Sequence, residues 1–161
     1  MSDDGRRRRI RVWLAFFIVA LVASGLTAFP LVTETRWLLA ALRGLGGLVP
    51  GGLVVWVERV HLALVDAGVR YPFLAYGTDW LAFAHLVIAM AFWGPWKDPV
   101  RNVWVIEWAM LCCLAIVPLA LVCGAVRGIP IYWRLIDISF GVFGLVPLWI
   151  VRREIGRLEG S

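Results

Sequence analysis

The sequence predicts an all-α protein, a polytopic membrane bundle of four transmembrane helices with an amphipathic segment on the outer face. Of the 161 residues, 61% are hydrophobic and the mean hydropathy is +0.83. This is far more apolar than a soluble domain with a water-facing surface. Four uncharged or nearly uncharged runs each reach the roughly 20 residues that one bilayer crossing needs. Basic residues gather at the ends of these runs, as topology signals do, and this distribution argues against a nucleic-acid partner.

The first apolar run follows a basic tail. Residues 1–11 contain the stretch RRRRIR, and residues 12–33 carry no charge. The apolar core of a cleaved signal peptide is usually about 7 to 15 residues long, which is shorter than this run. Further hydrophobic segments follow it in the chain. We therefore expect residues 12–33 to form a retained first transmembrane helix, with residues 1–11 as a cytoplasmic tail.

The segment at residues 34–70 is too polar and too interrupted for a simple span. It is broken by GG at 46–47 and by PGG at 50–52, and it carries several charges. On a helical wheel from Leu53 to Asp66 the charged residues and His61 share one arc, while apolar residues occupy the other side. We expect an amphipathic or re-entrant segment on the outer face of the membrane. A fifth, interrupted span is the alternative, and it would place the Arg-rich C-terminus outside.

Three more spans complete the predicted bundle. In chain order we expect a second span at 71–96, a cytoplasmic loop at 97–102, a third span at 103–126, an outer turn and fourth span at 127–151, and a cytoplasmic tail at 152–161. The two tails and the loop hold Arg and Lys at a higher density than the segments on the opposite side. The positive-inside rule then places both termini in the cytoplasm.

Four ionisable residues fall inside the predicted spans, in the outer half of the bilayer: Asp79, His85, Arg134 and Asp137. At a rise of about 1.5 Å per residue, Asp79 and Arg134 lie at the same depth, roughly 25 Å from the inner ends of their helices. Arg134 and Asp137 are three residues apart, a spacing that lets two side chains on one helix meet. Because unpaired charge in lipid is costly, we expect these residues to form a polar cluster.

Two interpretations of this polar cluster stay open. It is either an ion-pair network that joins the second and fourth spans, or a site open to the outer side and lined in addition by Tyr76 and Tyr132. In the second case His85 could exchange a proton near neutral pH. Nothing in the sequence separates the two.

A second group of charges is expected at the cytoplasmic boundary. Lys97, Asp98 and Arg101 lie in the predicted loop, and Glu107 follows about one helical turn inside the third span. The tight loop should return its basic residues to the depth of Glu107. We therefore expect a local salt-bridge knot in which Lys97 or Arg101 pairs with Glu107.

No pattern of residues indicates catalysis or a cofactor. A haem with two histidine ligands would need His61 and His85 at matched depth on facing helices, which their predicted positions do not give. A bound haem or pigment is left as a minor alternative. The sequence contains no phosphate loop, metal motif or nucleophile elbow, so we predict neither a metal nor an enzymatic activity.

Three stretches between Tyr71 and Glu154 carry a resemblance. They are YPFLAYGTDWLAFAH, KDPVRNVWVIEW and RGIPIYWRLIDISFG. In their style they resemble a family of small, uncharacterised bacterial integral membrane proteins with four helices. The resemblance covers about half of the chain. It implies a location in the bacterial inner membrane, and it implies nothing about chemistry.

Size and the lack of a catalytic pattern together predict the class of function. Four spans with short loops leave little room for an active site, while ten Trp and many aliphatic residues offer apolar surface to lipid and partner helices. We expect a non-enzymatic accessory subunit of a larger membrane complex, respiratory or photosynthetic, whose partners are the lipid bilayer and other membrane subunits. The alternative is a small transporter or membrane enzyme that uses Asp79, His85, Arg134 and Asp137.

Overall fold

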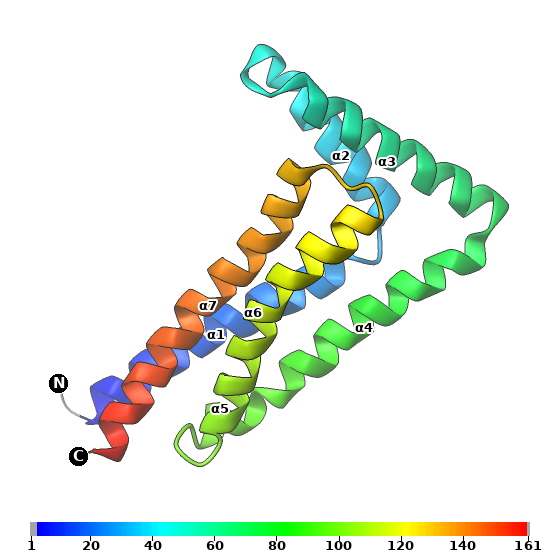
Figure 1. Cartoon of the computed structure of the whole chain (residues 1–161). Coiled ribbons are helices and arrows are strands. Elements are labelled where there is room, and N and C mark those ends of the chain that lie inside the picture. Colours follow the sequence, from blue (N-terminus) through cyan, green and yellow to red (C-terminus); the bar gives the residue numbers. More distant parts are fainter. Residues whose placement is uncertain (1–2, 161) are drawn as a thin grey trace. The chain divides into compact units, whose positions relative to one another are not determined.

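The computed structural model describes residues 3–160, and all of the regular structure in that range is helical (Figure 1). The α-helices are α1 (Asp3–Thr27), α2 (Leu31–Gly44), α3 (Gly51–Arg70), α4 (Ala75–Ala91), α5 (Trp93–Lys97), α6 (Val103–Val126) and α7 (Ile131–Glu159). Two short 3₁₀ helices, η1 (Gly46–Leu48) and η2 (Pro72–Leu74), lie before α3 and α4.

Four helical segments are long and apolar enough to cross a membrane. They are Asp3–Thr27, Pro72–Lys97, Val103–Val126 and Ile131–Glu159. The second consists of η2, α4 and α5 in succession, and the Trp96 amide donates to the Phe92 carbonyl at the start of α5. The prediction of an all-α chain with four such helices is confirmed.

Proline and glycine mark where the helices begin and turn. Pro30, Pro50 and Pro130 stand immediately before α2, α3 and α7. Proline favours such starts because its ring fixes φ and cannot continue a preceding helix. Between α6 and α7 the chain reverses at Gly128, whose φ of +67° is readily adopted only by glycine. A link of four residues therefore suffices to join two long helices.

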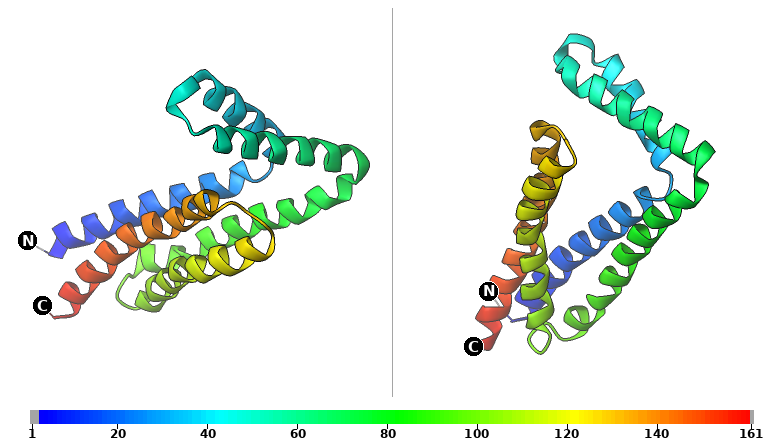
Figure 2. Two further views of the ribbon diagram at one scale, coloured as in Figure 1. Left: turned by 45° about the horizontal axis from the view of Figure 1, so that its top comes forward. Right: turned by 45° about the vertical axis from the view of Figure 1, so that its right-hand side comes forward.

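The chain divides into two compact units. The first comprises residues 3–20 and 89–160 of the described chain, and the second comprises residues 21–88. In the first unit α6 and α7 lie side by side in every view (Figure 1, Figure 2). Its core gathers around Leu14, Phe92, Ile106, Leu148 and Ile155, which have no exposed surface. This core lies at the end of the unit where α1 begins and α7 ends.

The second unit contains a helical hairpin of α2 and α3. Thr35 Oγ1 lies 2.9 Å from His61 Nδ1, and an Arg43 nitrogen lies 2.6 Å from a Glu58 carboxylate oxygen. The segment predicted as an outer amphipathic region is thus two paired helices joined by η1. Glu58 and His61, two residues of the predicted polar arc of α3, face α2.

Helical structure extends into both predicted tails. Residues 1–11 and 152–161 were expected to lie outside the spans as cytoplasmic tails, and in the structure α1 begins at Asp3 and α7 continues to Glu159. Arginine is a good helix former, and Asp3 and Asp4 place negative charge at the positive end of the α1 dipole. Both helices therefore extend beyond their apolar runs.

Candidate functional site

Among residues 3–160, Glu154 is the one charged residue that is buried, with 1% of its surface exposed. It lies on α7, on the face that also buries Val151 and Ile155. Residues separated by three or four positions share one side of a helix, so this face continues past the end of the apolar run. The helix thereby places a carboxylate where a hydrophobic residue would otherwise be expected.

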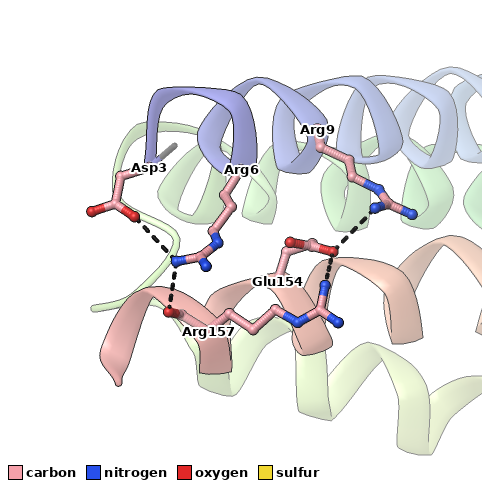
Figure 3. Close-up of polar contacts among 5 residues, drawn as sticks. All are labelled: Asp3, Arg6, Arg9, Glu154 and Arg157. Carbon is pink, nitrogen blue, oxygen red and sulfur yellow. Dashed lines mark hydrogen bonds and ion pairs between the residues drawn. The ribbon is translucent and has the colours of Figure 1, made fainter. Parts of the chain in front are cut away.

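Two arginines hold the Glu154 carboxylate (Figure 3). Nη1 of Arg9, on α1, lies 3.3 Å from Oε1, and Nη1 of Arg157 donates to the same oxygen at 2.8 Å. The arginine side chains are 48% and 43% exposed, whereas the glutamate side chain is 2% exposed. Its second oxygen, Oε2, is buried and accepts no hydrogen bond from the described residues. The carboxylate therefore depends on these two guanidinium groups.

Arg6 adds a second connection between α1 and α7. Its Nη1 donates to the backbone carbonyl of Arg157 at 3.1 Å and to Oδ1 of Asp3 at 3.1 Å (Figure 3). The last carbonyls of a helix have no partner within it, so this bond also satisfies one of those at the end of α7. We call Asp3, Arg6, Arg9, Glu154 and Arg157 the helix-end cluster.

The geometry of the helix-end cluster suits a structural role. Guanidinium groups do not release a proton in proteins, and their fixed fork of donors suits a carboxylate. Residues from the two ends of the chain are joined by one buried acceptor and two half-exposed donors. We therefore read the cluster as a joint between α1 and α7.

The helix-end cluster was not predicted, because its residues were assigned to two separate cytoplasmic tails whose structure was left open. A signal was present. Ile10 and Leu14 are one turn apart and both buried, as are Val151 and Ile155. Continuing each helix by this spacing would have placed Arg6, Arg9 and Glu154 on ordered turns.

The residues of the predicted outer cluster lie in different units. Tyr76, Asp79 and His85 are in the second unit. The His85 ring nitrogen Nδ1 lies 2.8 Å from the Leu81 carbonyl of the same helix. Tyr76 and Asp79 line a hollow of about 380 Å³ together with Phe29, Trp80 and Phe83. Within this unit no basic side chain forms an ion pair with Asp79.

Tyr132, Arg134 and Asp137 lie on α7, in the first unit. The Nε of Arg134 donates to the Ile129 carbonyl at 2.7 Å, and the side chain packs against Gly124 of α6. Of the ion pairs among the described residues, none joins Arg134 to Asp137. The guanidinium caps the preceding turn instead of meeting the carboxylate. A pairing of Asp79 with Arg134 would join the two units and stays a prediction.

The cytoplasmic-side knot forms with a different partner. Glu107 pairs with Arg152 of α7, whose Nε lies 2.7 Å from Oε1, and not with Lys97 or Arg101 as expected. The close packing of α6 against α7 brings the two side chains together.

The loop residues of the predicted knot have partners of their own. Lys97 Nζ lies 4.9 Å from the centre of the Trp93 ring, a cation–π distance. Oδ1 of Asp98 accepts a hydrogen bond from the Arg101 backbone amide at 3.1 Å. The loop is thus held by its own turn, and Glu107 serves the α6–α7 contact.

Comparisons with protein-family models, with curated proteins and with solved structures find no match for this chain. The resemblance of residues 71–154 to small bacterial membrane proteins therefore stays a prediction. In residues 3–160 no three His, Cys, Asp or Glu side chains are grouped so that they could hold a metal ion. The function has to be inferred from the distribution of apolar surface and charge.

Proposed function

We propose that the chain is an integral membrane protein of the bacterial inner membrane and acts as a non-enzymatic accessory subunit of a larger membrane complex. One combined observation carries this proposal. The candidate spans leave most of their apolar surface uncovered, and they also carry acidic residues that have no basic partner in their own unit. The complex would be an energy-converting one, respiratory or photosynthetic.

The apolar surface is the first part of that observation. In the 18-residue apolar stretch of each candidate span, between 11% and 22% of the residues are buried inside the chain. Large side chains such as Phe143, Leu111 and Met90 are at least 65% exposed. Lipid can cover such a surface, and so can the helices of a partner subunit.

The charged residues are the second part of that observation, because placing an unpaired charge against lipid costs free energy. Asp79 lies within the candidate span Pro72–Lys97 and Asp137 within Ile131–Glu159. Neither forms an ion pair within its own unit of the described chain. Ionisable groups within a bilayer usually face a protein partner or a wet cavity. A partner subunit would supply donors to these carboxylates and cover the apolar side chains around them.

Both termini are proposed to be cytoplasmic. The basic ends of α1 and α7 and the loop that carries Lys97 and Arg101 support this orientation through the positive-inside rule. Reporter fusions after residues 5 and 158 should give cytoplasmic signals, and fusions after residues 49 and 128 should give signals from the opposite side. Opposite signals from the two termini would favour the five-span alternative and contradict the outer position of α2 and α3.

Recovery of the complex tests the proposed function. The chain, tagged and expressed at its native level, is extracted in mild detergent and sized, and its companions are quantified. We expect a stoichiometric assembly with at least one other membrane subunit. Asp79→Asn should lower the yield of that subunit severalfold. Glu34→Gln on α2, which removes one carboxylate outside the candidate spans, should not.

A small transporter or membrane enzyme is the second candidate function. The hollow beside Asp79 favours it, because aromatic side chains line this hollow together with one acidic residue. With His85, Arg134 and Asp137 such a protein would handle an amphiphilic substrate. Recovery as a lone homo-oligomer would favour this candidate over the accessory subunit.

A further inference from the structure

Two hollows in the first unit share Ala15 of α1 and Trp96 of α5. The larger, of about 630 Å³, is an apolar groove. Its other walls are formed by Ile18, Val19, Ala89, Met90 and Trp93. The smaller hollow, of about 490 Å³, lies toward the start of α1 and is lined by Arg7, Arg8 and Arg11. The apolar groove thus leads into a basic hollow.

The basic hollow carries arginines that the fold does not use. Arg7, Arg8 and Arg11 are exposed, and no ion pair among residues 3–160 involves any of them. Asp4 is the one acidic residue in its lining. By contrast, Arg6 and Arg9 on the same helix are engaged by Asp3 and Glu154. The hollow therefore has an excess of positive charge that is free to bind an anion.

A fourth cation lies at its edge. A small adjoining gap is lined by Arg7, Arg11, Trp96 and Lys97. Lys97 Nζ lies over the Trp93 ring, which belongs to the apolar groove. Basic and aromatic side chains thus alternate where the two hollows meet. Tryptophan favours the boundary between hydrocarbon and headgroups, and arginine favours phosphate through its paired donors.

We propose that the two hollows together bind one anionic phospholipid. The phosphate lies among Arg7, Arg8 and Arg11, and an acyl chain follows the groove past Ala15 toward Val19. From Arg11 to Val19 the helix rises about 12 Å, which is most of one leaflet of a hydrocarbon core about 30 Å thick. The site takes an amphiphile, because a soluble anion would occupy the basic hollow and leave the apolar groove without a ligand. It takes an anionic one because a zwitterionic headgroup brings a positive charge to the arginines.

Lipid binding to the purified full chain tests the proposal. Native mass spectrometry in detergent would measure the dissociation constants of phosphatidylglycerol and of phosphatidylcholine with identical acyl chains, and of glycerol phosphate as the headgroup alone. We expect one tightly retained phosphatidylglycerol, weaker phosphatidylcholine, and no retained glycerol phosphate. Each basic residue near a membrane surface contributes roughly a factor of five to binding an anionic lipid.

Matched variants locate the site. The triple variant Arg7→Gln, Arg8→Gln, Arg11→Gln should lose up to about 100-fold in affinity for phosphatidylglycerol, with little change for phosphatidylcholine. The control variant Arg36→Gln, Arg59→Gln, Arg127→Gln removes the same charge from residues outside both hollows and should bind as the original chain does. Ala15→Phe keeps every arginine but fills the junction, and it should also weaken retention of phosphatidylglycerol.

Three results would overturn the proposal. They are equal affinity for the two lipids, undiminished binding of phosphatidylglycerol by the triple variant, and glycerol phosphate binding as tightly as the lipid, which would indicate a site for a free anion. If the triple variant does not fold, Ala15→Phe and the single change Arg8→Gln decide, because unchanged binding by both excludes the hollows as the site.

Discussion

Replacing Arg9 and Arg157 together by leucine is expected to destabilise the protein by about 3–5 kcal/mol. The double variant leaves Glu154, whose side chain is 2% exposed, without the two donors that hold it. A buried carboxylate without a partner costs far more than the loss of one contact, because its hydration is not restored. Reversible unfolding in mixed micelles with increasing SDS would measure the change.

The reverse change should be milder. Glu154→Gln leaves two arginines that are 48% and 43% exposed and so can turn to water. Adding Glu154→Gln to the double leucine variant should therefore recover much of the lost stability. The matched control is the double variant Arg43→Leu, Arg70→Leu, because the carboxylate partners of both arginines are exposed. Loss of each of these ion pairs should lower the free energy of unfolding by at most about 1 kcal/mol. Equal costs for the two double variants would contradict the burial of Glu154.

The second large effect is expected at the contact between α6 and α7. A Cβ at Gly141 would lie 2.5 Å from the backbone carbonyl oxygen of Cys113. A backbone atom of a packed helix cannot rotate away, so Gly141→Ala must separate the helices. We expect a loss of about 1–3 kcal/mol, although alanine itself favours a helix over glycine by roughly 1 kcal/mol. The same unfolding experiment measures it.

Two neighbouring glycines provide the controls for Gly141. At Gly156 a Cβ would meet the Arg152 side chain at an ordinary 3.5 Å, so Gly156→Ala should be neutral or stabilising. At Gly144 the near atom is Sγ of Cys113, at 2.9 Å. Cys113→Ala should therefore rescue Gly144→Ala and should not rescue Gly141→Ala. Rescue of both would place the clash at the sulfur and not at the backbone.

The sequence predicts the four long helices because each is a nearly uncharged run, and length and composition suffice to identify such runs. It does not predict the helical ends. Arg6–Arg11 and Arg152–Glu159 are polar, so hydropathy treats them as tails, although Ile10 and Ile155 show that one face of each helix continues to be buried. The helix boundaries are indicated by the spacing of the buried residues. Averaging the hydropathy over a window of residues removes this information.

Partners between helices were predicted less well than the helices themselves. Glu107 was assigned to the nearest basic residues in the chain, but Arg152 reaches it because α6 and α7 pack together. Arg134 was expected to meet Asp137 one turn away, yet a backbone carbonyl at Ile129 accepts from it instead. Spacing within one helix says which side chains can meet. Which of them do meet is decided by the neighbouring helix and by free backbone groups.

The hydrogen bond from Arg6 to the Arg157 carbonyl joins residues 151 positions apart. The α6–α7 hairpin is local in sequence and can form as soon as its short link at Gly128 has been synthesised. The helix-end cluster cannot, because Arg6 and Arg9 are synthesised long before Glu154. During synthesis the start of α1 therefore carries its arginines without their carboxylate at Glu154. A chain that stops before the last turns of α7 leaves them in that state. Closure of this contact therefore reports that synthesis has passed Glu154 and Arg157.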